Sequence, residues 1–543
     1  LHRRRHSFPT RRSSDLFLSK LQIPDPTTCF ECSQKQRLSF RNSSSLYNRK
    51  CDHSGEAIIS IYAPDKPYKV YRSDYWFSDK WNATDYRQEI DFNRPFFPQL
   101  KELQLKVPRL ALLNFNGENS DYCNSCVDNK DCYLIFGGDH NQSCLFGSLS
   151  MHNENIVDAD LSNMSKLCYM MSDCTNCYNC QFIFDSKNCS DCYFVSDSSS
   201  CQNCILCTNL HNAQYCINNI QVSKEEFEQK KKEWLNGSFE QQQKLLDQFK
   251  KLRAERIVKF THTISCDNCS GDYLQNSKDC HNCYDTSESQ DLYNVVFATK
   301  TKDAMNSSML GDKTELVYDA ISTSNAYNSK YSFGILNSQN VDYSDLVLDS
   351  HDMFGCVCIK NQAYCILNKP YAKEEFVNVR NKLIEHMKKT GEWGKPLPKE
   401  LSCFGYNETC AQEYYPMSKE EAQKRGFTWY ERDNSNSYQG PEVKISDHIG
   451  DVPDSLIRDI LTCTICNKNY RIVAQELAFY REHKIPAPKS CHICRYKLRQ
   501  SFRNPRILWD RNCMKCGMSF KTTYAPERTE KVYCESCYLE TVY

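Results

Sequence analysis

Four Cys-x-x-Cys pairs near the C-terminal end are the residues of this chain whose types and spacing point most directly to chemistry. The pairs are Cys463 with Cys466, Cys491 with Cys494, Cys513 with Cys516, and Cys534 with Cys537. Twenty-four residues separate the first two pairs and seventeen separate the last two. Because Zn²⁺ takes four thiolates in a tetrahedron and each short turn supplies two, this spacing predicts two Zn²⁺ sites. Cysteine would fill every position of both sites, so neither would hold a catalytic water.

The local sequence indicates how these pairs would be positioned. Residues 495–500, Arg-Tyr-Lys-Leu-Arg-Gln, predict a helix whose first turn carries the second pair, which is the arrangement of a treble clef. Gly517 suits the tight turn that follows the third pair. We therefore expect one treble-clef zinc module at residues 461–500 and a second at residues 501–543.

The opening of the chain, residues 17–75, repeats the C-terminal module. An offset of 462 residues aligns Cys29 and Cys32 with Cys491 and Cys494. The partner pair would fall at positions 1 and 4, but residues 1–16 look like a translated sequencing adapter, so we expect them to lie outside the fold. The copy is therefore predicted to be truncated. A weaker metal site is predicted from Cys29, Cys32, Cys51 and His53.

The centre of the chain repeats every twelve residues. The positions in register are Cys132, Cys144, Ile156, Cys168, Cys180, Cys192, Cys204 and Cys216. Every third position of a repeat is small or apolar, and Asp recurs at turn positions such as Asp173, Asp185 and Asp197. The pattern favours a mainly β fold with a β-solenoid at residues 121–222, in which cysteine is a small packing residue. It leaves open whether one coil takes twelve or twenty-four residues.

Other interpretations of this repeat carry chemistry. Two triplets imitate the spacing of iron–sulfur ligands without the fourth ligand: Cys174, Cys177 and Cys180, and Cys201, Cys204 and Cys207. The stacked aspartates could bind a cation, although a ladder of turns explains them as well. The coil resembles the β-helical antifreeze proteins of insects, but the Thr-x-Thr ladder that would bind ice is absent.

A second copy of the repeat follows. An offset of 149 residues places Lys224-Glu225-Glu226-Phe227 on Lys373-Glu374-Glu375-Phe376, so residues 261–371 are expected to form a second β-solenoid. Ser223 and Ser238 are expected to cap two helices. The remaining segments are predicted to be a cap on the first solenoid at residues 76–120, a helical hairpin at 223–260, a helix at 372–390 and a connector at 391–460.

The cysteine modules resemble known families. Residues 463–499 look like a zinc-ribbon (treble-clef) family, with Phe-Tyr before a proline pair and a closing Cys-x-x-Cys-Arg. Residues 513–537 look like a related treble-clef family with Tyr-Ala-Pro before the last pair. From residue 17 onward the chain is similar to an uncharacterised cysteine-rich family of uncultivated bacteria. This resemblance implies zinc binding and no known activity.

Charge and cysteine usage bear on the compartment and the partners. Of the 543 residues, 481–531 hold thirteen Lys or Arg against four Asp or Glu, whereas 121–222 hold eleven acidic side chains and three lysines. The 34 cysteines and the metal-type spacing favour a reducing cytoplasm over a disulfide framework. No apolar stretch approaches the roughly eighteen residues of a membrane span. The true N-terminus is expected to be missing, so a signal peptide stays open.

These features predict a non-enzymatic zinc-binding scaffold that interacts with a macromolecule, either a protein or a nucleic acid. Six basic side chains are candidates for phosphate contacts: Arg495, Lys497, Arg499, Arg503, Arg506 and Arg511. The alternative is that these arginines brace the module against the solenoid. Two other classes remain, an iron–sulfur protein and a β-helix enzyme acting on polysaccharide, for which no carboxylate pair stands out from the turn ladders.

Overall fold

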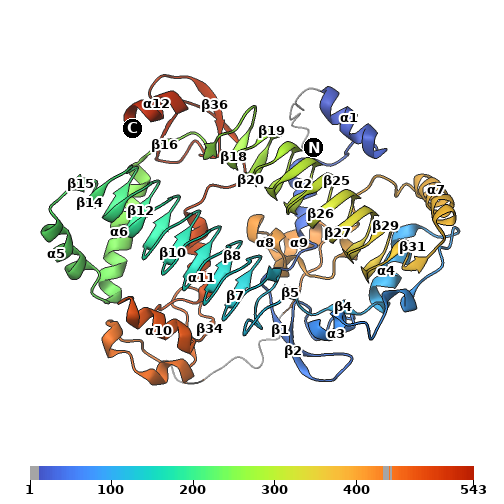
Figure 1. Cartoon of the computed structure of the whole chain (residues 1–543), viewed down its shortest axis with the longest axis horizontal. Helices are drawn as coiled ribbons and strands as arrows, with labels where there is room; N and C mark the ends of the chain where they lie inside the picture. Colours follow the sequence, from blue (N-terminus) through green and yellow to red (C-terminus); the bar gives the residue numbers. More distant parts are fainter. Residues whose placement is uncertain (1–10, 432–439, 441–442, 543) are drawn as a thin grey trace. The chain divides into compact units, whose positions relative to one another are not determined.

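Parallel strands displaced by twelve residues dominate the structure. The computed structural model describes residues 11–431, 440 and 443–542, so residues 1–10 of the adapter-like segment lie outside the described part. The chain divides into unit 1, residues 1–112 and 261–431, and unit 2, residues 113–260 and 432–543. Each unit contains one large, mainly parallel sheet, several helices and one end of the chain (Figure 1).

The large sheet of unit 2 has nine strands that lie side by side in chain order (Figure 1). They are β7 (Tyr133–Phe136), β8 (Leu145–Ser148), β9 (Val157–Asp160), β10 (Tyr169–Ser172), β11 (Gln181–Phe184), β12 (Ser190–Ser196), β13 (Gln202–Thr208), β14 (Gln214–Ile217) and β15 (Ile220–Gln221). From β7 to β14 neighbours are parallel, and residues twelve apart are partners, as in Cys192 and Cys204. Bridges outside these strands, such as Lys130 with Gln142, keep the same step. Successive rungs, meaning successive repeats, are therefore displaced by twelve residues.

The predicted inward positions of unit 2 are buried. The eight residues in the register from Cys132 to Cys216 all belong to one buried cluster, which also contains Cys177, Cys189 and Cys201. The thiol of Cys180 donates a hydrogen bond to the carbonyl of Tyr178 at 3.2 Å, and Cys192 does the same to Ser190 at 3.3 Å. The cysteines thus act as small packing residues whose S–H groups are satisfied by the backbone.

Left-handed backbone recurs at every third residue of the rungs. Asp173, Asn176 and Asn179 have φ of 55°, 55° and 51°, and the predicted turn residues Asp185 and Asp197 have φ of 49° and 51°. Asn and Asp tolerate this conformation better than other L-residues because their short side chains bond to nearby backbone. This preference explains why the two residue types recur at fixed positions of the repeat.

Helices and short strands complete unit 2. The predicted caps are confirmed: Ser223 accepts a hydrogen bond from the N–H of Glu226 at the start of α5 (Lys224–Trp234), and Ser238 caps α6 (Phe239–Glu255). The remaining elements are β5 (Asn114–Phe115), β6 (Cys126–Val127), β16 (Ile257–Lys259), β33 (Leu461–Thr462), β34 (Asn469–Tyr470), α10 (Ala474–Glu482), α11 (His492–Ser501), β35 (Trp509–Asn512), β36 (Ser519–Thr522), β37 (Lys531–Tyr533) and α12 (Glu535–Val542).

The large sheet of unit 1 has sixteen strands and the same twelve-residue step along most of its length. They are β17 (Thr263–Ile264), β18 (Gly271–Gln275), β19 (Lys278–His281), β20 (Cys283–Ser287), β21 (Gln290–Tyr293), β22 (Val296–Thr299), β23 (Thr301–Met305), β24 (Ser308–Leu310), β25 (Thr314–Tyr318), β26 (Ile321–Lys330), β27 (Phe333–Asp342), β28 (Asp345–Leu348), β29 (His351–Phe354), β30 (Val357–Lys360), β31 (Ala363–Ile366) and β32 (Lys369–Pro370). Ser329, Val341 and Met353 are in-register partners, so the position that holds cysteine in unit 2 accepts other residues here.

The N-terminal segment packs within unit 1. Its elements, with the helices that follow the sheet, are α1 (Arg11–Leu21), α2 (Phe30–Leu38), β1 (Tyr47–Lys50), β2 (Ala57–Ser60), β3 (Val70–Tyr71), α3 (Ser73–Phe77), α4 (Phe96–Lys106), β4 (Arg109–Leu110), α7 (Lys373–Thr390), α8 (Cys410–Tyr414) and α9 (Lys419–Lys424). Among the described residues, every helix is too short or too polar to cross a lipid bilayer.

The segment predicted to cap the first repeat packs on the second repeat instead. Gln104 of α4 donates to the Asp345 carboxylate at 3.0 Å, and Arg109 forms a buried ion pair with the same carboxylate. The ring centroids of Phe96 and Phe354 lie 5.5 Å apart. The assignment of residues 76–120 to the first repeat is therefore wrong up to residue 112, because these polar and aromatic partners lie in residues 261–371.

Candidate metal centres

The first predicted tetrad is assembled in unit 2. The sulfur atoms of Cys463, Cys466, Cys491 and Cys494 all lie within 4.8 Å of one another. The β33–β34 hairpin carries the first pair, and the second pair sits at the start of α11, where Cys491 is the N-cap residue. Asn467, with φ of 57°, lets the chain turn after Cys466. The helix predicted from residues 495–500 begins about one turn earlier, at His492, and Cys494 lies in its first turn.

The second predicted tetrad has the same construction. The sulfur atoms of Cys513, Cys516, Cys534 and Cys537 also lie within 4.8 Å of one another. The β35–β36 hairpin carries the first pair, with Gly517 at φ of 80° in the turn, and α12 carries Cys537. The turn predicted at Gly517 is confirmed.

Backbone N–H groups make one sulfur of each tetrad acidic. The Cys491 N–H lies 3.3 Å from Cys463 Sγ, and the Cys534 N–H lies 3.3 Å from Cys513 Sγ. Burial raises the pKa of both thiols, but the donated hydrogen bonds outweigh it and lower the pKa of Cys463 and of Cys513 to about 6. Each tetrad thus has at least one sulfur prepared to lose its proton to a metal ion.

Sulfur separations within the tetrads suit a four-coordinate ion. Cys466 Sγ lies 3.8 Å from Cys491 Sγ, and Cys516 Sγ lies 3.7 Å from Cys534 Sγ. With Zn–S bonds of about 2.3 Å, the edge of a regular tetrahedron is about 3.8 Å. Both donor sets therefore fit an ion of this size, and their chemistry is that of a structural centre rather than a Lewis acid with an open position.

The weaker site predicted in the opening copy is not assembled. In the described part of the chain, the two cysteine tetrads are the groups whose ligand atoms converge, and Cys29, Cys32, Cys51 and His53 do not form a third. Cys51 accepts a hydrogen bond from the N–H of Arg72 at 3.4 Å, and the His53 ring stacks on Tyr75 at a centroid distance of 3.6 Å. The structure therefore does not bring the four predicted ligands together, because Cys51 and His53 have other partners.

A buried ion-pair network fixes the first module to the sheet of unit 2. Arg499 Nε lies 2.6 Å from Asp160 Oδ2, and its Nη1 lies 2.7 Å from Asp158 Oδ1. Arg495 bridges Asp158 and Glu476 at 2.6 and 3.0 Å, and none of these five side chains is more than 4% exposed. Burial lowers the pKa of Arg499, but the two carboxylates outweigh it, so the pKa stays above its ordinary value.

Arginines also occupy the predicted aspartate ladder. Asp173 pairs with Arg503 at 2.8 Å, Asp185 with Arg253 at 3.3 Å and Asp197 with Arg256 at 2.8 Å. The aspartates are therefore both turn residues and ion-pair partners, and their cations are guanidinium groups supplied by the same chain. This satisfies their charge without a bound ion.

These contacts bear on three of the six basic side chains that were predicted to contact phosphates. The prediction of phosphate contacts is wrong for Arg495, Arg499 and Arg503, because their guanidinium groups are taken up by carboxylates of the same chain. Lys497 is exposed, and Arg506 and Arg511 are half-buried, so for these three the prediction stays untested.

Sequence reasoning missed the carboxylates that receive these arginines. A signal was present, because Asp158 interrupts an otherwise apolar column with a twelve-residue step. The column reads Phe146, Asp158, Met170, Phe182, Phe194 and Leu206. A single acid in such a column predicts a buried cationic partner, although it does not say which one.

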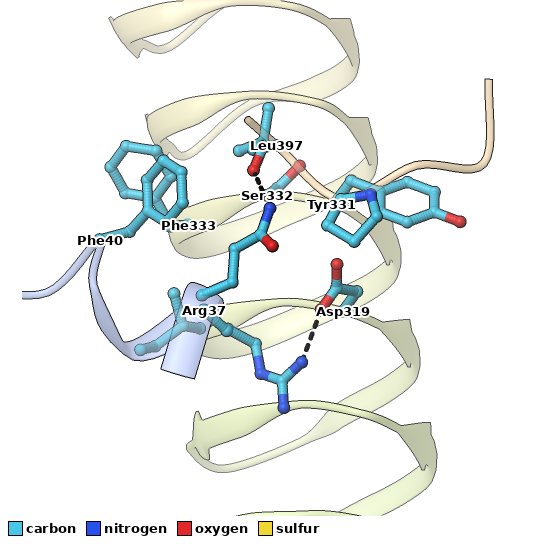
Figure 2. Close-up of a pocket in the computed structure, with 10 residues that line it drawn as sticks. Arg37, Phe40, Asp319, Tyr331, Ser332, Phe333 and Leu397 are labelled. Atoms are coloured by element: carbon cyan, nitrogen blue, oxygen red, sulfur yellow. Dashed lines mark hydrogen bonds and ion pairs between the residues drawn. The ribbon is translucent and has the colours of Figure 1, made fainter. Parts of the chain in front are cut away.

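The opening copy docks on unit 1 in the equivalent manner. Arg37 and Arg41, which align with Arg499 and Arg503, contact Asp319 at 2.5 Å and the hydroxyl of Ser322. Figure 2 shows Arg37 directed at Asp319, with Phe40 beside Phe333 at a small pocket also lined by Leu397. The docking residues of the module are thus retained in the copy even though its metal tetrad is not.

Replacing Cys192 with alanine tests whether the interior cysteines pack or bind metal. The side chain is fully buried and its S–H bonds to a backbone carbonyl. We expect a loss of stability of roughly 1 kcal/mol, from the lost sulfur contacts and hydrogen bond, with no change in metal content. Urea unfolding and elemental analysis measure the two effects, and a fall in bound metal would favour the iron–sulfur interpretation.

Comparison with known proteins adds little to this geometry. No protein-family model matches the chain, and no curated protein matches it. One similar solved structure is a putative acetyltransferase from Desulfovibrio desulfuricans G20, at 9% identity, covering 49% of this chain and 69% of that one with a TM-score of 0.10. A score this low carries no argument about fold or activity.

Proposed function

We propose that this protein is a non-enzymatic scaffold stabilised by two structural Zn²⁺ ions. The observation that carries the proposal is the convergence of four cysteine sulfurs at each of two places in unit 2. Four thiolates leave no position for a substrate or a catalytic water, so the ions would hold the module together rather than react. Zinc is the metal that most often occupies tetrathiolate sites of this spacing.

The architecture we propose is a pair of β-solenoids bearing treble-clef modules. Parallel pairing at a twelve-residue step, in unit 2 and along most of unit 1, on more than one line of bridges, supports a coiled chain. A hairpin followed by a helix at each tetrad supports the treble clef. Stacked rungs would offer long regular faces for a partner.

We propose a macromolecular partner in a reducing compartment. All 34 cysteines lie within the described residues, and none of them forms a disulfide bond. This supports a reducing environment. With three of the six candidate basic side chains engaged in ion pairs, a protein partner is favoured over a nucleic acid. Salt-dependent binding of the full-length protein to RNA or DNA, weakened by Lys497→Ala, would reverse that preference.

Metal analysis of the purified full-length protein tests the central proposal. We expect about two zinc atoms per chain and a colourless solution, because Zn²⁺ has no d–d transitions. Cys516→Ser should leave about one zinc atom, since it removes a ligand of the second tetrad alone. A brown protein that contains iron, or a metal content unchanged by Cys516→Ser, would contradict the assignment.

A further inference from the structure

Six cysteines are not buried, and two of them lie in the repeat of unit 1. Cys466 and Cys516 belong to the tetrads, and Cys29 and Cys32 belong to the opening copy. The other two, Cys266 and Cys269, are half-buried at the start of the unit 1 sheet. A cysteine that only fills an interior should be buried, as the other repeat cysteines are. Cys266 and Cys269 are therefore the repeat cysteines that a reagent in solution can reach.

Backbone pairing places Cys269 next to Cys280. Both Cys266 and Cys269 follow β17, the edge strand of the sheet. The Asp267 N–H bonds to the Ser277 carbonyl at 3.0 Å, and the Ser270 N–H bonds to the Cys280 carbonyl at 2.8 Å. This register puts Cys269 directly beside Cys280 on the following rung. Paired strands lie about 4.8 Å apart, which is inside the Cα separation of about 4.4–6.8 Å that a disulfide spans.

The thiols of this group influence one another's pKa. Cys280 shares thiol hydrogen bonds with Cys283 and with Cys269. Those bonds lower the pKa of Cys280, whereas burial raises the pKa of Cys269. Cys280 and Cys283 are fully buried. A half-exposed thiol therefore lies beside a buried thiol on the next rung, and Cys269 is the member of the pair that solvent reaches.

We propose that Cys269 and Cys280 form a thiol–disulfide exchange site that reacts with low-molecular-weight disulfides. Cys269, which solvent reaches, loses its proton, attacks one sulfur of the disulfide and displaces the first thiolate. Cys280 then attacks the Cys269 sulfur of this mixed disulfide and displaces the second. Two protein thiols are oxidised to one disulfide, one small disulfide is reduced to two thiols, and these take up the two protons. The site is independent of the proposed zinc centres.

Peptide mapping of the full-length reduced protein after incubation with oxidised glutathione tests the proposal. Free thiols are blocked with N-ethylmaleimide, and the protein is cleaved with trypsin without reduction. Cleavage at Lys278 separates residues 260–278, which hold Cys266 and Cys269, from residues 279–300, which hold Cys280 and Cys283. We expect the two peptides to be joined by one disulfide that fragment spectra assign to Cys269 and Cys280. Separate peptides, or a link through Cys266 or Cys283, would overturn the proposal.

Two controls define the site further. Cys123 and Cys126 have the same spacing near the start of the unit 2 repeat but are fully buried, so peptide 110–130 should show no disulfide after glutathione treatment. Cys266→Ser should keep the link, and Cys269→Ser should abolish it. Persistence of a link between the two peptides in Cys269→Ser would overturn the proposal, and the wild-type map decides the question even if a variant misfolds.

Discussion

Cys491→Ser is expected to remove one of two bound metal ions and to unfold the module at residues 461–500. Cys491 supplies a sulfur, and its N–H donates to Cys463 Sγ, while serine is a poor ligand for Zn²⁺. Structural zinc contributes about 10–16 kcal/mol of binding free energy in small modules, so the loss of one thiolate should exceed what local packing can replace. Elemental analysis should fall from about two zinc atoms to about one, and limited proteolysis should cut within residues 461–500.

The chain supplies a matched control for this experiment. Cys29 aligns with Cys491 in the opening copy, also at the N-cap of a helix, but it does not belong to a converged group. Cys29→Ser should therefore leave the zinc content and the protease pattern unchanged. Equal metal loss in both variants would show that the opening copy also binds metal, and no loss in Cys491→Ser would remove the tetrad from the metal sites.

Arg499→Met is expected to destabilise unit 2 by about 3–5 kcal/mol. The substitution keeps much of the side-chain volume but leaves Asp160 without its arginine and Asp158 with Arg495 alone, in a site where both carboxylates are at most 1% exposed. An uncompensated buried charge is costly because the interior cannot solvate it. Urea unfolding followed by circular dichroism measures the change in the free energy of unfolding.

An exposed ion pair provides the comparison for Arg499. Arg481 pairs with Asp454, whose side chain is 89% exposed, so Arg481→Met should cost less than about 1 kcal/mol. Adding Asp160→Asn to Arg499→Met should restore part of the lost stability, because a neutral amide is cheaper to bury than a carboxylate. A loss below about 1 kcal/mol for Arg499→Met would mean that the network does not hold the module on the sheet.

Local and periodic features were predictable from the sequence. The tetrads follow from the four Cys-x-x-Cys pairs, because two ligands three residues apart lie on one short turn. The buried cysteines follow from the twelve-residue repeat, because residues twelve apart in the sequence become neighbours on adjacent paired strands. Helix starts at Ser223 and Ser238 follow from capping, which involves only neighbouring residues.

Features that join distant segments required the coordinates. Asp160 and Arg499 are 339 residues apart, and no local rule assigns one charged side chain to another over that distance. The same limit explains why the sequence pattern assigns residues 76–112 to the wrong repeat and predicts phosphate contacts for Arg495, Arg499 and Arg503. Sequence by itself determined which residues are suited to bind metal, to turn and to be buried, because these properties depend on residue type and spacing. Only the tertiary structure decided which partner each charged or aromatic side chain has, because burial energy depends on what surrounds it.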